Sequence, residues 1–411
     1  MPPVRGRSDG MKPAALFIML TVLIDAMGIG LMVPVMPDLI REVQDGTLAE
    51  AAVWGGVLAT SFAAMQFLCG PALGSLSDRF GRRPVLLVSL GVMAMDYVVM
   101  ALAGSIWLLL AGRLVGGITA ATQGTAAAYM ADISTPRDRT RNFGLIGASF
   151  GAGFVLGPLI GGMLAEYGTR APFWAAAGLA TANVVLGWVV LHETVRPEHR
   201  RAFEWRRANP LGVLRNLDRL PGVRQLLLVY FFYHVAFAVY PSVWSYFGQE
   251  RFGWTPALIG LSLGLFGAVM ALVQGGAIRL ALRWWGERGT VVAGHVFAVA
   301  AYGALGIIAS GPVALLLTPL AALAGVIPPA LQGIMSQRVA ADAQGELQGA
   351  LTSAASLAMI LSPLAMTWTF AAFTHRDTPF YLPGAPFLVA MCLTVAALAL
   401  FVRPAVRTDA A

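Results

Sequence analysis

Long stretches without a charged residue are the feature that most limits what this chain can fold into. Residues 51–77, 114–131 and 225–249 contain no Asp, Glu, Lys or Arg. The hydrocarbon core of a bilayer is about 30 Å thick and needs about 20 apolar residues per helix. Because the chain is 57% hydrophobic and only 12% charged, we expect lipid to surround most of it.

Proline and glycine turn signals divide the apolar sequence into helices. We therefore expect an all-α membrane protein with twelve transmembrane helices in two pseudo-symmetric six-helix bundles. The predicted helices span residues 13–38, 51–77, 84–103, 105–131, 142–166, 171–191, 224–249, 256–282, 289–309, 313–337, 346–373 and 384–402. The predicted units are an N-terminal bundle (1–192), a cytoplasmic connector (193–222) and a C-terminal bundle (223–411). Within the connector, we expect residues 211–220 to form an amphipathic helix on the membrane surface.

An internal repeat relates the two halves of the chain. Turn and helix residues match at an offset of about 205 residues, and each pair falls at the same place relative to its predicted helix. The matched pairs are Gly55 with Gly260, Gly81 with Gly286, Arg83 with Arg288, Gly144 with Gly349 and Pro158 with Pro363. Two parallel six-helix repeats predict a substrate site at mid-membrane between them.

The distribution of arginines predicts the orientation. If both termini are cytoplasmic, the outer loops contain only Arg41, Arg170, Arg251 and Arg376, and all other basic residues except Arg113 lie on the cytoplasmic side. This bias agrees with the positive-inside rule and explains the net charge of +7 without a nucleic-acid partner. We expect a multi-pass protein of a bacterial inner membrane that works as a monomer.

A glycine- and arginine-rich loop follows the second predicted helix. Glycines allow a tight turn there, and the arginines can pair with carboxylates or lipid phosphates. The loop residues are Gly74, Asp78, Arg79, Gly81, Arg82 and Arg83. A carboxylate at a helix C-terminus is unfavourable, so Asp78 needs a partner. The segment resembles the signature loop of the major facilitator superfamily.

Two further segments resemble motifs of the same superfamily. Residues 113–117 resemble its arginine motif, and residues 153–162 resemble the motif of its drug–proton antiporters. The antiporter motif consists of Gly153, Gly157, Pro158, Gly161 and Gly162, whose small residues allow helices to approach closely. Glycines alone could also reflect ordinary helix packing, whereas the full motif with its proline is rarer.

The match extends along nearly the whole chain to the bacterial tetracycline exporters. Residues 24–37, 129–133, 247–252 and 345–349 resemble segments of those proteins. The resemblance implies proton-coupled efflux of a drug by alternating access. One position departs from it: the exporters carry an acidic residue in the ninth helix, and this chain has none near His295. This departure weakens the expectation that tetracycline is the substrate.

Charges deep in the membrane are costly, so each is a candidate for function. Three residues qualify: Asp25, Asp96 and Arg113. We predict that Asp25 carries the proton, because desolvation favours the neutral carboxyl and substrate could compete for the same site. Alternatively, Asp25 forms a structural ion pair with Arg113. For Asp96 we weigh coupling and structural roles equally, and we expect Arg113 to tune a carboxylate.

Polar residues within predicted helices are candidates for contact with substrate. They are Gln66, Gln123, His234, Gln274 and His295. The two histidines could equally be hydrogen-bonded core residues. No P-loop, nucleophile elbow or metal-ligand spacing occurs, so we expect no catalytic residue, no metal site and no enzyme.

The expected partners are a small-molecule substrate, protons and the lipid bilayer. No cofactor is expected, because the proton gradient supplies the energy; a tetracycline-like substrate would bring its own divalent metal ion. A proton-coupled transporter of a sugar or another metabolite is the main alternative, and a transport-inactive receptor or scaffold is a distant one. By resemblance, the loop around Asp78 should act as a latch against residues 344–347.

Overall fold

Helices make up the computed structural model, which describes residues 13–120, 122–135, 138–195, 198 and 222–403. No strand occurs within those ranges. Eleven helical stretches in them are long and apolar enough to cross a membrane. One of these, Pro256–Ile307, has 52 residues and would be about 78 Å long at 1.5 Å per residue, so it must contain two spans. The predicted all-α membrane fold of two six-helix bundles is confirmed.

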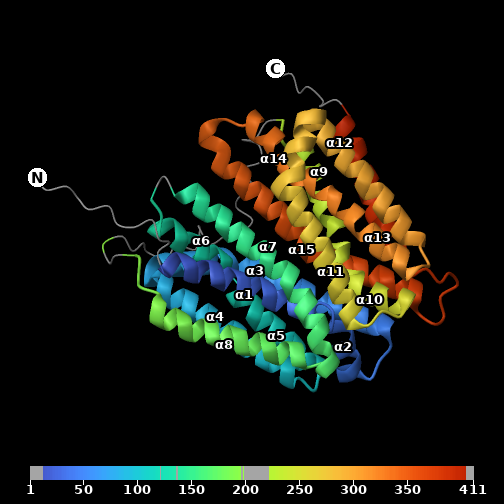
Figure 1. The fold of residues 1–411 in the computed structure, drawn as a ribbon, viewed down its shortest axis with the longest axis horizontal. Coiled ribbons are helices and arrows are strands. Elements are labelled where there is room, and N and C mark those ends of the chain that lie inside the picture. The colour runs from blue at the N-terminus through green and yellow to red at the C-terminus, as the bar shows by residue number, and fades with distance from the viewer. Residues whose placement is uncertain (1–12, 121, 136–137, 196–197, 199–221, 404–411) are drawn as a thin grey trace, which may run out of the picture.

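The first half of the chain forms one bundle (Figure 1). α1 packs against α7 and α8, and α4 packs against α5 and α8. The helices of this half are α1 (Pro13–Met32), α2 (Met36–Gln44), α3 (Leu48–Phe80), α4 (Arg82–Leu102), α5 (Ile106–Thr119), α6 (Thr122–Ile133), α7 (Arg139–Leu164) and α8 (Ala171–Val190).

The second half forms the other bundle, in which α16 packs against α9 and α12. Its helices are α9 (Arg224–Phe237), α10 (Val239–Phe252), α11 (Pro256–Leu272), α12 (Ile278–Ile307), α13 (Gly311–Ala322), α14 (Ile327–Arg338), α15 (Gln344–Thr374) and α16 (Ala385–Val402). A π-helical turn, Val273–Ala277, joins α11 to α12, and a 3-10 turn, Leu323–Val326, joins α13 to α14.

Matching glycines make the same turn in both bundles. Gly81 has a φ of 109° between α3 and α4, and Gly286 has a φ of 64° within the long α11–α12 run. Side chains with a Cβ rarely adopt such angles, so both positions favour glycine. Gly286 thus divides α12, and the predicted turn between the eighth and ninth spans lies there.

Several predicted spans are broken rather than continuous. The first was expected over residues 13–38, but α1 ends at Met32 and α2 begins at Met36. Pro34 lies in this turn, where its missing N–H cannot continue a helix. The fourth span divides into α5 and α6 and the seventh into α9 and α10. The proposed surface helix 211–220 lies outside the described residues.

The glycines of the 153–162 segment bring α7 against α1. A Cβ at Gly157 would lie 2.6 Å from the carbonyl oxygen of Met27 and 2.8 Å from the Cα of Gly30. Gly153 and Gly161 face the backbone of the same helix, at Leu23 and Leu31. Gly162 instead faces Pro256 at the start of α11, in the other bundle. This segment therefore packs against α1 and against the second half of the protein.

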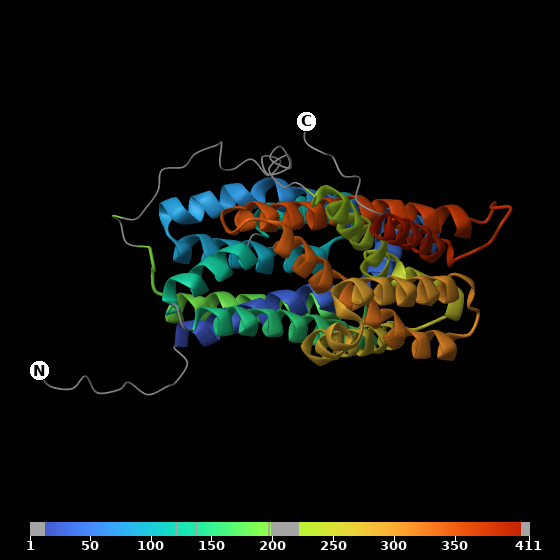
Figure 2. The ribbon, with the colours of Figure 1, turned by 90° about the horizontal axis from the view of Figure 1, so that it is seen from above.

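The two bundles meet at one end and separate at the other, as the V in Figure 1 shows. We call the end with the Gly81 and Gly286 turns the basic end, and the opposite end, with α2 and the 375–384 loop, the far end. α3 contacts α15 and α7 contacts α11. These contacts are on the far-end side, where Gly56 packs against Pro363 and Leu364. Seen from above in Figure 2, the helices of both bundles project along the same direction, and their inclination to one another is visible in Figure 1.

Replacing Gly157 by Ala should destabilise the protein by about 1–3 kcal/mol, because the new methyl group overlaps the α1 backbone. Gly151→Ala on the same helix is the control, since a Cβ there meets nothing within 4 Å. That change should be neutral or stabilise the helix by up to about 1 kcal/mol. The measurement is the folded fraction after heating in detergent. Equal losses in both variants would contradict the packing explanation.

Candidate functional site

A cavity of about 850 Å³ lies between the two bundles. Its lining comes from both halves: α1, α3 and the α5–α6 break on one side, and α9, α10, α14 and α15 on the other. Asp25 and Arg113 are the charged residues among its lining, and the rest is apolar with scattered hydroxyl and amide groups. Its position agrees with a substrate site at the interface of two repeats.

Asp25 lies in the middle of α1, is 5% exposed and contributes to the cavity wall. Its Oδ2 atom is buried without a hydrogen-bond partner. No ion pair of the described residues includes it, so the alternative of an Asp25–Arg113 pair is not what the structure shows. The hydroxyl of Tyr97 lies within electrostatic reach of Asp25, Asp96 and Arg113, so the three charges form one cluster.

Arg113 pairs with Asp96 instead. An Nη2–H of Arg113 donates to Oδ2 of Asp96, and both side chains are buried. Two glycines of α5 make room for the carboxylate, because a Cβ at Gly112 or Gly116 would lie 2.8 Å from one of its oxygens. The guanidinium also lies 5.0 Å from the ring centre of Phe62, a cation–π geometry. The pair is neutral overall, so Asp25 is the remaining ionisable acid of the cavity lining.

Two of the five candidate polar residues reach the cavity. Gln66 and Gln123 line it, and the Nε2 amide of Gln66 donates to the carbonyl of Ala120, 3.2 Å away. This carbonyl belongs to the break between α5 and α6.

The other three candidates lie outside the cavity lining. His295 is fully buried, and its Nδ1–H donates to Val291 O at 2.8 Å. His234 makes the same bond to Tyr230 O at 2.9 Å. Gln274 is exposed on the π-helical turn. In both histidines Nδ1–H donates to the preceding helical turn, and Nε2 of His295 is buried without a hydrogen-bond partner.

Sequence reasoning missed the polar groups that the second half supplies. Tyr230 and Gln332 line the cavity and are joined by a hydrogen bond of 3.3 Å. Gln348, Thr352 and Ser356 form a polar strip on α15 that faces the same space. Their spacing of four residues on a membrane helix was a usable signal, because such residues share one face.

Arg82 organises the loop after α3. Its Nη1 atom lies 2.5 Å from Oδ1 of Asp78, and its Nε atom lies 3.4 Å from Oδ2 of Asp132. The carboxylate of Glu193 accepts from the backbone N–H groups of Arg82 and Arg83 at the start of α4, at 2.9 and 3.3 Å. Sequence reasoning found Asp78 and its need for a partner, but not Asp132 or Glu193, which are distant in sequence.

The other residues of this loop make their contacts within their own half, as far as the structure describes it. Arg79 lies over the Phe80 ring, Arg83 donates to Trp188 O, and a Cβ at Gly74 meets nothing within 4 Å. Gln344 bonds Ser336 of its own half. Asp78 pairs with Arg82 of its own loop, and the latch to residues 344–347 stays a prediction.

The profile of the Major Facilitator Superfamily matches residues 18–363. The chain belongs to this family. Tetracycline resistance protein class C of Escherichia coli is 42% identical over 359 residues, which are 87% of this chain and 90% of that protein. The crystal structure of the human organic anion transporter MFSD10 (TETRAN) is 26% identical with a TM-score of 0.69, over 95% of this chain and 99% of that one.

A bacterial homolog of the human lysosomal transporter Spinster, in an inward-facing and occupied conformation, has a TM-score of 0.78 at 16% identity. It covers 95% of this chain and 97% of that one, and shows the fold. The protein is therefore a multi-pass membrane transporter of the major facilitator type and not an enzyme.

Hydrogen bonds between the two bundles close the transporter at its far end. Gln249 donates to Oδ2 of Asp38 at 3.0 Å, Ser245 to Val33 O at 2.8 Å, and Thr60 to Ile360 O at 2.9 Å. Burial raises the pKa of the Asp38 carboxyl, and the bond from Gln249 and the charge of Arg41 oppose that rise. The bundles separate toward the basic end (Figure 1), and a Cβ at Gly70 or Gly124 of the cavity lining would meet nothing within 4 Å, so the cavity is open on that side.

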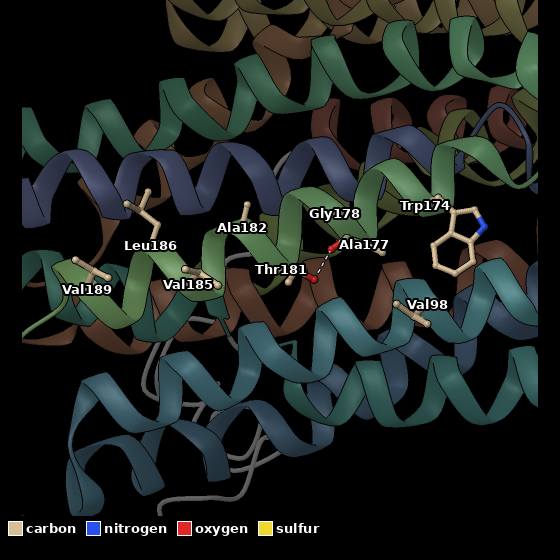
Figure 3. A pocket seen from close by; sticks show the side chains of 9 residues that line it. All are labelled: Val98, Trp174, Ala177, Gly178, Thr181, Ala182, Val185, Leu186 and Val189. Atoms are coloured by element: carbon tan, nitrogen blue, oxygen red, sulfur yellow. Dashed lines mark hydrogen bonds between the residues drawn. The ribbon is translucent and has the colours of Figure 1, made fainter.

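A second hollow lies on the outer face of the first bundle, between α4 and α8 (Figure 3). It is lined by Val98 and by residues of α8 from Trp174 to Val189. Its hydroxyl group, that of Thr181, donates to Ala177 O at 2.7 Å on its own helix. Apart from the indole N–H of Trp174, its side chains are apolar or hydrogen-bonded to their own helix, so the groove suits lipid chains better than a polar substrate.

The described residues contain no group of three or more His, Cys, Asp or Glu that could hold a metal ion. The chemistry of the site is consequently that of one carboxylate, one ion pair and neutral donors and acceptors.

Removing either partner of the Asp96–Arg113 pair should destabilise the transporter by about 3–5 kcal/mol, because the remaining charge is buried and unpaired. The double variant Asp96→Asn/Arg113→Gln should recover part of that loss. Thermal unfolding in detergent measures all three. Additive losses in the double variant would show that the two side chains do not act as a pair.

Gln249→Ala should favour opening of the far end, because it removes a bond between the bundles worth about 1 kcal/mol. Spin labels at exposed positions 45 and 377 should report about a fivefold larger population of long distances. Gln225→Ala is the matched control, since that amide bonds Leu400 and Arg403 within its own bundle. An unchanged distance distribution in Gln249→Ala would argue against the closure.

Proposed function

We propose that this transporter exports a small amphipathic molecule in exchange for protons, by alternating access, in the inner membrane of a bacterium. The observation that carries the proposal is Asp25: a buried carboxylate without a counter-ion, on the wall of a mostly apolar cavity. Such a group is costly when charged, so it gains by binding either a proton or a cationic part of a substrate. Because the proton and the substrate compete for this one carboxylate, substrate is exported in exchange for protons.

The Asp96–Arg113 ion pair supports different roles for Asp96 and Asp25. Because Arg113 is paired with Asp96, it does not compensate the charge of Asp25. Arg113 and Asp25 both lie within electrostatic reach of the Tyr97 hydroxyl, and the guanidinium stays protonated. Asp96 is thus proposed as a positioning partner for Arg113, and Asp25 as the proton carrier.

The conformational cycle would rock one bundle against the other. With both termini in the cytoplasm, as the arginine distribution predicts, the open basic end faces the cytoplasm and the far end is closed to the outside. Substrate would enter from the cytoplasm, displace the proton from Asp25 and leave after the far end opens. In the opposite state the loop around Asp78 would reach residues 344–347. Each chain contains a complete cavity, so a monomer suffices.

The relatives support a drug or another organic molecule as substrate. The class C relative is named for resistance to tetracycline, and the MFSD10 structure is that of an organic anion transporter. This chain lacks an acidic residue near His295 in the ninth span, which favours a different drug or an endogenous metabolite over tetracycline itself. No cofactor is needed; if the substrate is a metal chelate, the ion travels as cargo.

Asp25→Asn should abolish proton-driven transport while the protein still inserts and folds, because asparagine cannot take up a proton. The assay follows a panel of candidate drugs into inverted vesicles, with the proton gradient on or off. Asp45→Asn is the control, since Asp45 is an exposed carboxylate at the end of α2. Full gradient-driven transport by Asp25→Asn would refute the assignment. If wild type carries none of the drugs, a metabolite panel tests the alternative substrate class.

A further inference from the structure

The two halves of the protein differ in charge at equivalent positions of the basic end. In the first half, Arg82 pairs with Asp78 and Asp132. The repeat offset of 205 residues superimposes the ends of α6 on those of α14. At this offset Asp78 corresponds to Arg283. Asp132 corresponds to Gln337. The second half therefore has no carboxylate at either position where the first half neutralises its loop.

The loop around Gly286 consequently has arginines without an acidic partner. Arg279 and Arg283 are exposed, and no ion pair of the described residues includes either of them. The acid of this loop, Glu287, accepts a hydrogen bond of 2.8 Å from Nε2 of Gln337. Two positive charges thus lie on the surface of α12 with no counter-ion among the described residues.

The other bundle does not supply the missing acid at the equivalent contact. At the same offset, residues 344–347 correspond to residues 139–142, which include Arg139 and Arg141. The acid beside them, Asp138, already pairs with Arg141 at 3.3 Å. Contact of Arg283 with this segment would bring like charges together. The counter-charge for Arg279 and Arg283 therefore does not come from the start of α7.

An apolar surface lies beside the two arginines. Arg279 and Arg283 are four residues apart on α12, so their side chains share one face of the helix. Leu280 and Trp284 form the next row along the same helix, and they are 44% and 65% exposed. Trp285 is exposed as well, with its ring centre 6.5 Å from that of Trp284. Because tryptophan is enriched where a membrane meets water, this part of α12 fits the headgroup level.

We propose that this surface of α12 binds an anionic phospholipid of the membrane leaflet at the basic end. The phosphate lies between the guanidinium groups of Arg279 and Arg283, which match its geometry with charge-assisted hydrogen bonds. The glycerol and an acyl chain follow Leu280 and Trp284. A lipid fits better than a soluble phosphate, because the basic row and the apolar row are neighbours on one helix. This inference goes beyond the proposed function, since it holds whatever the substrate is.

The test compares two lipids that differ in headgroup charge. The purified full-length protein in dodecyl maltoside is titrated with dioleoyl phosphatidylglycerol or dioleoyl phosphatidylcholine, and native mass spectrometry counts the bound lipid. Wild type should bind phosphatidylglycerol about tenfold more tightly, because choline neutralises the phosphate of the other lipid. Arg279→Gln/Arg283→Gln should reduce this preference to about twofold.

Arg139→Gln/Arg141→Gln is the matched control, since it removes two exposed positive charges from the start of α7 at the same end of the protein. It should keep the tenfold preference, because residues two apart do not share a helix face. Arg283→Asp gives the second half the charge of the first. It should abolish the preference, because the new carboxylate neutralises Arg279 one helical turn away.

Thermal unfolding of each variant in the same detergent should match that of wild type, because all the changed side chains are exposed. The proposal is overturned if wild type binds the two lipids equally, or if either Arg279→Gln/Arg283→Gln or Arg283→Asp keeps the full preference. Loss of the preference to the same extent in Arg139→Gln/Arg141→Gln would also overturn it, since binding would then reflect only the total charge of this end.

Discussion

The ion pair between Asp96 and Arg113 is the interaction on which the rest of the site depends. The pair neutralises Arg113 within the first bundle. It can form because Gly112 and Gly116 of α5 leave room for the Asp96 carboxylate. With Arg113 engaged by Asp96, Asp25 has no counter-ion among the described residues. Two aspartates on neighbouring helices thus have different roles because only one of them reaches the guanidinium.

A second constraint is that the contacts between the bundles are confined to one side. Near the far end, glycines of α3 and α7 lie against prolines and carbonyl groups of the opposite bundle, with a few hydrogen bonds between them. Toward the basic end the same helices separate. Small residues and few bonds make an interface that packs closely but can be released, which alternating access requires.

Sequence reasoning found the architecture and the charges, because both follow from the cost of placing polar groups in lipid. The spans, the repeat, Asp25, Arg113 and the loop around Asp78 were all visible in this way. The breaks at Ala120 and Ala238 were not visible in the sequence, because alanine favours helices. Tertiary packing overrides that preference at both positions. A single sequence does not show which helices are neighbours. It therefore could not give the partner of Arg113, the roles of Asp132 and Glu193, or the inward face of α15.

The length of α3 has a mechanical consequence. Its 33 residues extend for about 50 Å, well beyond a bilayer core of about 30 Å. It is held against the other bundle near its first turns, at Gly55 and Gly56, and its last turns carry Asp78. The helix is therefore a lever with its fulcrum at one membrane surface. The 22 residues from Gly56 to Asp78 span about 33 Å, so a tilt of about 10° at the fulcrum moves the Asp78 end by about 6 Å. A movement too small to disturb the glycine contacts can thus open or shut the cavity at the opposite surface.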